Sequence, residues 1–569
     1  VTIPTTDYFG SSRIYNPDIG IFEYQFSRWK NDAGSTDWNT AANWDGGIPT
    51  GSRDIVIPTG ATNYPVGGFP GVTVGAGKYL ILEAGAKATV GTLTNNGVLR
   101  MEDDNTQPAS LIVNSYSRGG SGTEEIQLYL TGGGNESQDN YKWHYISSPV
   151  SSLSTNVFTG NTLDLAQWVE SRPSISLRQG WVAFDGYVYS TGLMGGPTFN
   201  SLLTGTNGKG YNYWHSSDFL YTISGLLNTS DVTAPIAFSG NANLHGYNLL
   251  GNPFTSGLDW NYIISDLSFP ANTSMGLYYT RDNVVCTYIS GVGVPGDVNG
   301  IIPPMQGFFT KTYATGNSIL LPLAARTHDN VHQRYKGSGS VIPLVRIGLE
   351  GSDYSDETVV RFDELAKAGL DNDFDAEKIF YTETKTYLYT KLNDINYAIN
   401  GQPFPETSVT IPLVLNVTTD GNHTLSAMQL QGLDRYKVKL IDMLKNETID
   451  LRARPLYFFS SDKGTISDRF ALMIEYMTTD SELLPETGSD FSIYASGYHI
   501  NIIPEGELWE GKQGSVTIID LAGKRTGITN EVEFSRGELI QVEAPQKSGI
   551  YFVELRSGVL RHTGKIVIK

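Results

Sequence analysis

Residues 549–555 of this chain read GIYFVEL, residues 556–558 read RSG and residues 565–569 read KIVIK, which is the pattern of a β-hairpin. The first of these stretches is apolar on both faces from Ile550 to Leu555, as in the central strand of a sheet. In the last stretch side chains alternate, so the two isoleucines share one face and the two lysines the other. Lysines at an exposed edge protect that edge from pairing with other strands.

The region around this hairpin has the strand spacing of a small all-β domain. Short apolar stretches at regular intervals predict an immunoglobulin-like sandwich over residues 491–569. The polar residues 478–490, which include Pro485 and Gly488, are expected to be a linker. The predicted strands are Phe491–Tyr494, His499–Ile503, Ser515–Ile519, Val532–Phe534, Leu539–Val542, Ile550–Leu555 and Lys565–Ile568.

This strand pattern and the terminal hairpin resemble the C-terminal sorting domain, type A-like, of proteins exported by the type IX secretion system of Bacteroidetes. The resemblance implies that the hairpin is an export signal, with Gly549, Tyr551, Lys565 and Lys569 as its residues. It also implies recognition by the outer-membrane shuttle barrel and the translocon of that system. The protein would then be extracellular, at the cell surface and associated with the outer membrane.

In that family the sorting domain is normally removed when the protein is attached to the surface. Its presence here leaves two alternatives, which are retention in a surface assembly and capture of the chain with the export machinery. Because the chain begins with Val1 rather than methionine, we expect that a leader has been removed.

Residues 1–135 carry apolar pulses of two or three residues, such as Val72–Val74, separated by glycine and asparagine. Such pulses are too short for ordinary sandwich strands and predict the rungs of a parallel β-helix. Trp29, Trp38 and Trp44 precede them and are expected to cap the end of the stack. The segment resembles the β-helical surface modules of secreted Bacteroidetes proteins.

Residues 136–325 contain an internal repeat. Residues 143–152 (WHYISSPVSS) match residues 247–256 (YNLLGNPFTS), and a glycine-aromatic strand follows each copy, at Gly210 and Gly307. The similar spacings predict a duplicated β-sandwich region with a unit of roughly 100 residues.

The remaining segments are predicted to be a linker at residues 326–340 and a further β-sandwich domain at residues 341–477. The sequence therefore predicts an all-β, multidomain chain with a β-helical N-terminal module, β-sandwich domains and a C-terminal immunoglobulin-like sorting domain.

The net charge of −19 excludes some classes of partner. Nucleic acid requires a basic face, and so does electrostatic binding to an anionic membrane surface, so neither partner is expected. With one cysteine, Cys286, no intramolecular disulfide can form. Its apolar neighbours predict that Cys286 is a small buried hydrophobic residue.

No motif in the chain points to catalysis. A zinc-helix motif, a nucleophile elbow and a phosphate loop are all missing, so no enzyme, no catalytic residue and no bound cofactor are predicted. The densest carboxylate cluster is residues 371–377 (DNDFDAE), in which Asp371, Asp373 and Asp375 are candidate calcium ligands. Its sixth residue is alanine instead of the glycine of an EF-hand, and a capped polar turn is the alternative.

Trp168, Trp181 and Trp214 lie in the first repeat without obvious counterparts in the second, and are candidates for a ligand surface. Large aromatic residues of all-β domains more often fill the core. Two functions follow. The first is a non-enzymatic, adhesive or structural surface protein capable of self-assembly. The second is a polysaccharide-binding or polysaccharide-degrading surface protein, which clustered Trp and Tyr side chains beside two carboxylates would favour.

Overall fold

The computed structural model describes most of the chain. Among these residues strands dominate, and the single α-helix, α1, spans only Trp260–Ser265, which confirms the all-β prediction. No helix in the described parts is long and apolar enough to cross a membrane. The described ranges are 26–31, 33–66, 71–134, 141–158, 164–173, 177–189, 191–194, 202–203, 208–240, 244–281, 284–329, 341–351, 354–380, 385–477, 491–496, 499–506, 509–521, 524–558 and 560–568.

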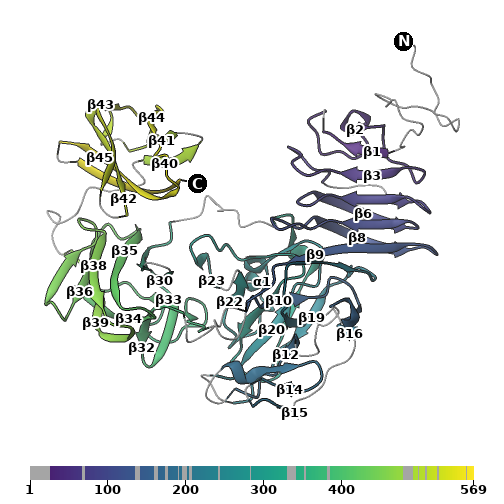
Figure 1. The fold of residues 1–569 in the computed structure, drawn as a ribbon, viewed down its shortest axis with the longest axis horizontal. Helices are drawn as coiled ribbons and strands as arrows, with labels where there is room; N and C mark the ends of the chain where they lie inside the picture. The colour runs from purple at the N-terminus through teal and green to yellow at the C-terminus, as the bar shows by residue number, and fades with distance from the viewer. Residues whose placement is uncertain are drawn as a thin grey trace.

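The N-terminal part is a stack of short strands in two sheets (Figure 1). One sheet has the order β18-β9-β7-β5-β3-β1-β2 and the other the order β4-β6-β8. Neighbours run parallel except where β2 and β18 pair antiparallel at the two ends. The bounds are β1 Phe26–Trp29, β2 Trp44–Asp45, β3 Asp54–Ile57, β4 Val72–Val74, β5 Tyr79–Leu82, β6 Lys87–Asn95, β7 Val98–Met101, β8 Ser110–Arg118, β9 Thr123–Leu130 and β18 Phe219–Ile223.

In this part of the chain, the parallel register places apolar residues of successive strands next to one another. Ile57, Leu82, Met101 and Ile126 are partners in successive strands and are all buried, so they form one apolar ladder through the stack. At the β1–β2 end the rings of Trp29 and Trp38 pack edge to face on Trp44, with centroids 5.1 and 4.7 Å away. The three indoles cover the last rung, which would otherwise expose its apolar face.

The middle region contains two larger sheets, of orders β10-β17-β12-β13-β14-β15 and β20-β26-β22-β23-β24. Three smaller sheets, β11-β16, β19-β27 and β25-β21-β28, are formed by other strands of the same stretch of sequence. The bounds are β10 His144–Ser147, β11 Leu153–Ser154, β12 Leu165–Trp168, β13 Trp181–Ala183, β14 Tyr187–Val188, β15 Leu193–Met194, β16 Leu202–Leu203, β17 Gly210–Tyr213, β19 Val232–Pro235, β20 Tyr247–Gly251, β21 Gly257–Asp259, β22 Leu277–Arg281, β23 Val284–Ile289, β24 Val292–Val294, β25 Ile301–Ile302, β26 Gly307–Lys311, β27 Ser318–Leu321 and β28 Arg326–Thr327.

The two copies of the sequence repeat meet in an approximately two-fold arrangement. Strand β10 pairs with β17 in the first copy as β20 pairs with β26 in the second. Between the copies, the Ser147 N–H donates to the Met305 carbonyl, and the equivalent Gly251 N–H donates to the Gly208 carbonyl, both at 2.8 Å. Equivalent residues therefore make equivalent contacts across the interface.

The middle region is fastened to the N-terminal stack at several points. Strand β18 comes from beyond the predicted boundary at residue 135, yet it extends the first sheet by pairing with β9. Thr255 and Leu111 exchange two hydrogen bonds, of 2.8 and 2.9 Å.

The start of the predicted linker 326–340 is also packed on the stack. The Arg326 guanidinium donates to the Val113 carbonyl at 2.6 Å. Both ring nitrogens of His328 are engaged, Nε2 by Thr89 Oγ1 at 2.8 Å and Nδ1 by Ser110 Oγ at 2.9 Å. Residues 326–329 are thus part of an interface, because their polar groups find partners there, and residues 330–340 lie outside the described residues.

Residues 341–477 form one continuous sheet of eleven strands, where the sequence predicts a sandwich of two sheets. The order is β37-β36-β39-β34-β32-β33-β30-β29-β35-β38, with β31 paired to β33. The sheet curls, so that Phe459 of β38 and Phe470 of β39 meet with ring centroids 4.8 Å apart in one shared core. The bounds are β29 Leu344–Glu350, β30 Ser355–Phe362, β31 Ala376–Glu377, β32 Tyr387–Leu392, β33 Ile395–Gln402, β34 Ser408–Val417, β35 Gly421–Gln431, β36 Tyr436–Asp442, β37 Glu447–Asp450, β38 Leu456–Ser461 and β39 Gly464–Tyr476.

The C-terminal domain consists of a three-stranded sheet, β40-β41-β44, and a four-stranded sheet, β43-β42-β45-β46. Their core includes Trp509, which packs edge to face on Phe491 and Phe534. Each of the seven predicted strand ranges overlaps one observed strand. The bounds are β40 Phe491–Ser496, β41 His499–Pro504, β42 Lys512–Asp520, β43 Arg525–Phe534, β44 Ile540–Glu543, β45 Gly549–Ser557 and β46 Leu560–Ile568.

Candidate functional site

The terminal hairpin has one buried face and lies at the end of its sheet. Strand β46 is the last strand in the sheet order, and it pairs with β45 from Gly549↔Ile568 to Ser557↔Leu560. Gly558 adopts a φ of +59°, a left-handed conformation that glycine takes without strain, and this allows the chain to reverse there.

The residues of the predicted export signal differ in accessibility. Tyr551 is buried, and its hydroxyl donates to the Lys547 carbonyl at 2.8 Å, so Tyr551 supports the fold of the domain. Gly549 and Lys565 are half-buried, and Lys569 lies outside the described residues. Lys565, a residue of the predicted signal, lies on the outer face of β46 together with the exposed Val567.

The outer face of β45 carries a buried carboxylate. Glu554 forms ion pairs with Arg556, at 2.9 Å, and with Arg561 of β46. Desolvation is the largest single influence on the pKa of Glu554 and raises it. The hydrogen bonds and charges of the two arginines together outweigh desolvation, so the pKa of Glu554 is lowered overall. Glu554 therefore stays ionised and paired.

A cleft of about 490 Å³ lies between this outer face and the curled sheet of residues 341–477. This volume falls within the roughly 300–1,000 Å³ typical of ligand sites. Phe458 on the curled sheet exposes 54% of its surface, so the cleft offers an aromatic ring to solvent. The cleft is lined by Lys445, Glu447, Ala453, Arg454, Pro455, Leu456, Tyr457, Phe458, Ile519, Phe552, Glu554, Arg561 and Thr563.

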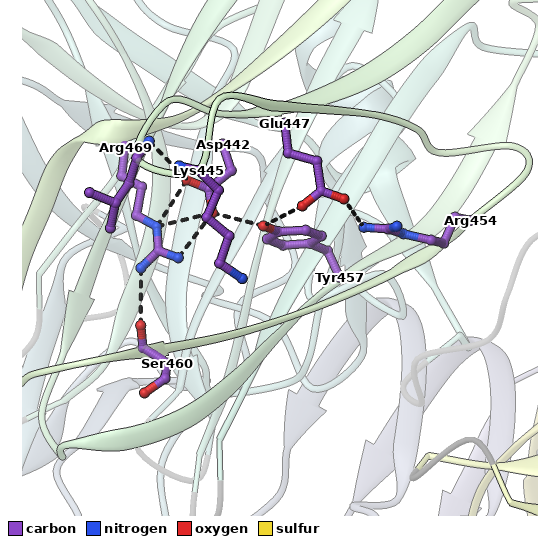
Figure 2. A network of polar contacts seen from close by, with 8 residues as sticks. Asp442, Lys445, Glu447, Arg454, Tyr457, Ser460 and Arg469 are labelled. Carbon is purple, nitrogen blue, oxygen red and sulfur yellow. Dashed lines mark hydrogen bonds and ion pairs between the residues drawn. The ribbon is translucent and has the colours of Figure 1, made fainter.

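A polar network holds together the curled-sheet wall of this cleft (Figure 2). Strands β37 and β38 are the two ends of the sheet, and the Tyr457 side chain of β38 bridges them. Its hydroxyl donates to Asp442 Oδ2 at 2.8 Å and lies 3.3 Å from Glu447 Oε2. Together with Arg469 these residues are the seam network, which joins by side chains two strands that the sheet order leaves apart.

Asp442 and Arg469 are the buried centre of the seam network. The Arg469 Nη2 group lies 2.9 Å from Asp442 Oδ2, and its Nη1 group donates to the Ser460 carbonyl of β38 at 3.0 Å. Desolvation raises the pKa of Asp442 most strongly, but its hydrogen bonds from Arg469, Tyr457 and the Lys445 N–H together lower it. At the cleft surface Arg454 pairs with Glu447 at 2.8 Å. The carboxylates of this wall are thus held in ion pairs.

The three tryptophans of the predicted ligand surface separate into two environments. Trp168 is buried, its indole N–H donates to the Tyr247 carbonyl at 2.6 Å, and its ring packs on Trp181 and Phe309. Trp168 therefore offers no free ring face, which corrects that part of the prediction: the second repeat covers it. Trp214 lies apart from this pair, half-buried and with Tyr141 edge-on at 5.1 Å.

The candidate calcium ligands serve the backbone of their own loop. Asp371 accepts the N–H groups of Lys367 and Asp373, each at 3.1 Å. Asp375 accepts those of Asp371 at 2.8 Å and Gly401 at 2.6 Å, and burial raises its pKa to about 8. No three His, Cys, Asp or Glu side chains within the described ranges are arranged to hold a metal ion. The carboxylates of Asp371 and Asp375 thus cap backbone N–H groups, as in the polar turn that is the alternative to calcium binding.

The same loop fastens the curled sheet to the middle region. The Met275 N–H donates to the Asn372 carbonyl at 2.9 Å, and the Ser290 hydroxyl donates to the Asp373 carbonyl at 2.7 Å. Beside them, Glu377 of β31 accepts Lys311 Nζ at 2.6 Å, and Lys311 is almost wholly buried.

The phenol of Tyr247 completes this clamp, donating to Glu377 at 3.0 Å. Desolvation lowers the pKa of Lys311 more strongly than the attraction of Glu377 raises it. The clamp could not be predicted from the sequence, because Lys311 and Glu377 are 66 residues apart and no local motif links them.

Comparison with known proteins identifies one family. Residues 28–474 match the model of a family described as a domain of unknown function (DUF8693). No curated protein matches the chain.

Two solved structures show a low similarity. One is titled "Biofilm associated protein - BSP domain", with 12% identity and a TM-score of 0.12, covering 78% of this chain and 96% of that chain. The other is dimeric latent PorU from Porphyromonas gingivalis, with 10% identity and a TM-score of 0.12, covering 62% of this chain and 35% of that one. Similarity at this level carries no argument about fold or function.

Proposed function

The chain belongs to the DUF8693 family, a domain of unknown function, and we propose that it is a non-enzymatic cell-surface protein, adhesive or structural, exported by the type IX secretion system. In this proposal residues 1–477 are the body that acts outside the cell, with a β-helical head, a duplicated sandwich and a further, curled β-domain. Residues 491–569 are an immunoglobulin-like sorting domain, recognised by the outer-membrane shuttle barrel and the translocon.

The observation that supports the proposal most is the position of β46. It is the last strand of its sheet, with Phe491 of β40 packed beside it on His562, and Lys565 and the exposed Val567 lie on its outer face. The opposite face of the hairpin is committed to the core of the domain through Ile566 and Ile568. A recognition element needs such a combination of one face fixed in a core and one face turned outward.

Two further observations support a division into body and export domain. The family match ends at residue 474, close to the end of β39, and leaves the C-terminal domain outside it. The body itself is locked together by the Lys311–Glu377 clamp and by the contacts of Arg326 and His328. An acidic body of stacked sheets, joined by these contacts, suits an adhesive or structural role. In such a role a pulling force on the protein is distributed over many contacts.

Secretion assays in the native host test the export step. Deletion of residues 549–569 is expected to leave the protein inside the cell, and Lys565→Glu is expected to reduce the surface fraction because it reverses the charge on the outer face of β46. Lys524→Glu is the matched control, since Lys524 carries the same charge in the turn between β42 and β43 of the same domain. If the truncated chain reached the cell surface in wild-type amounts, the export proposal would be wrong.

A further inference from the structure

One end of the six-stranded sheet of the middle region gathers aromatic and acidic side chains. In this sheet His144, Tyr213 and Leu165 are in register across β10, β17 and β12. At the same end of these strands lie the adjacent residues Trp143, Trp214 and Asp164, which neighbour His144, Tyr213 and Leu165 in that order. The Trp214 N–H donates to the Asp164 carbonyl at 3.0 Å. Strands far apart in the sequence thus bring two indoles and a carboxylate to one edge.

The other end of the same sheet is covered by the second repeat. There Trp168 and Trp181 lie opposite each other, and Phe309 of β26 packs on both, with ring centroids 5.0 and 5.8 Å away. Tyr145 joins the same cluster at 5.3 Å from Phe309. These rings pack into a core shared by the two repeats.

At the end of the sheet that carries Trp143 and Trp214, four half-buried rings form what we call the open aromatic cluster, which consists of Tyr141, Trp143, Tyr189 and Trp214. Trp143 is the hub, with centroid distances of 6.0 Å to Tyr189 and 6.5 Å to Trp214. The indole N–H of Trp214 donates to the Gly133 carbonyl at 2.8 Å, which fixes the orientation of this ring. The edge-to-face contacts hold the rings in place while part of each stays accessible.

Acidic residues border the cluster. Asp164 is joined to Trp214 through its backbone carbonyl, and the Asp185 carboxylate accepts the Tyr187 N–H at 3.0 Å in the turn that leads to Tyr189. Burial raises the pKa of the Tyr189 hydroxyl, and the charges of the two carboxylates raise it further. The backbone N–H of Lys142 shares the Gly133 carbonyl with the Trp214 indole, while the charge of its side chain acts on Asp218. The site therefore offers ring faces and carboxylate acceptors together.

We infer that the open aromatic cluster, with Asp164 and Asp185, is a binding site for a neutral glycan. The apolar faces of sugar rings stack on tryptophan and tyrosine, and sugar hydroxyls donate to carboxylates. An anionic ligand is disfavoured by the two carboxylates and by the net charge of −19. Aromatic rings and carboxylates also suit quaternary ammonium groups, and salt-dependent binding of tetramethylammonium distinguishes that ligand from a glycan.

The site does not depend on the export proposal, because its residues belong to the middle region and none of them lies in the C-terminal domain of residues 491–569. It is tested by affinity electrophoresis of the purified full chain in gels containing neutral glucan, mannan or xylan. At least one of these polysaccharides is expected to retard the wild-type chain. Trp143→Ala and Trp214→Ala are each expected to weaken this binding about tenfold or more, which corresponds to about 1.4 kcal/mol.

Tyr262→Ala is the matched control, since Tyr262 is an exposed ring on α1 outside the cluster, and binding should be unchanged. Circular dichroism verifies that each variant is folded, and the conservative variant Trp214→Phe is expected to retain most of the binding. The inference is overturned if none of the polysaccharides retards the wild-type chain, or if folded Trp143→Ala and Trp214→Ala bind as well as wild type. Binding of tetramethylammonium with loss at high salt, in place of polysaccharide, would also overturn it and assign a cation site.

Discussion

Replacing Arg469 by methionine tests whether side chains close the curled sheet. Arg469 and Asp442 are buried, at 8% and 0% exposure, and the guanidinium also donates to the Ser460 carbonyl across the seam. Methionine fills a similar volume but leaves the Asp442 carboxylate buried without its counter-ion. Breaking a buried pair in this way typically costs about 3–5 kcal/mol.

Amide hydrogen exchange measures this loss locally, which is necessary because the chain contains several units and does not unfold in one step. None of the nine tryptophans lies in residues 341–477, so tryptophan fluorescence would not report on this sheet. Peptides from β36, β38 and β39 should lose protection by roughly two to three and a half powers of ten, since about 1.4 kcal/mol corresponds to one power.

Arg454→Met is the matched control, because Arg454 makes an exposed ion pair with Glu447, and such pairs are worth about 1 kcal/mol or less. The reasoning would be refuted if Arg469→Met changed protection no more than this control does. A result of that kind would mean that the shared core, and not the seam network, keeps β37 and β38 together.

Two further predictions concern the joints of the body. Lys311→Met should lower the free energy of the opening that allows amide exchange in peptides containing Glu377 by about 3 kcal/mol. It leaves a largely buried carboxylate without its counter-ion. Lys391→Met, which breaks an exposed pair, is the control and should have little effect. Burial, with the charges of Lys87 and Arg326, lowers the pKa of His328 to about 4, below the roughly 6.5 of an unfolded histidine. The unfolded chain then binds the extra proton first, so the melting transition that includes the N-terminal stack should move to lower temperature as pH drops from about 6.5 to 4. His328→Gln should flatten this slope in calorimetry, and an unchanged slope would contradict the assignment.

The predictions that succeeded rest on local pattern. The alternation of apolar residues located all seven strands of the C-terminal domain, and the run around Cys286 correctly indicated a buried thiol. Such patterns succeed because a strand turns successive side chains to opposite faces whatever its partner is. The spacing of the repeat likewise identified strands that pair in the same way in both copies.

Other features of the structure depend on groups whose partners come from elsewhere in the chain. Residues 371–377 look like a ligand loop in isolation, but backbone N–H groups, including that of Gly401, occupy the oxygens of Asp371 and Asp375. Trp168 looks available until the second repeat places Phe309 over it. The sandwich predicted for residues 341–477 is one curled sheet, because strand patterns do not state which strands are neighbours.

The sequence by itself determined the strand content, the buried face of the terminal hairpin and the acidic character of the chain. These follow from side-chain alternation and charge, which are properties of residues and their immediate neighbours. Only the tertiary structure decided that Lys311 meets Glu377, that Tyr457 closes a seam and that Trp143 and Trp214 share an open edge. Each of these contacts joins residues distant in sequence, and their pairing is set by how whole sheets pack.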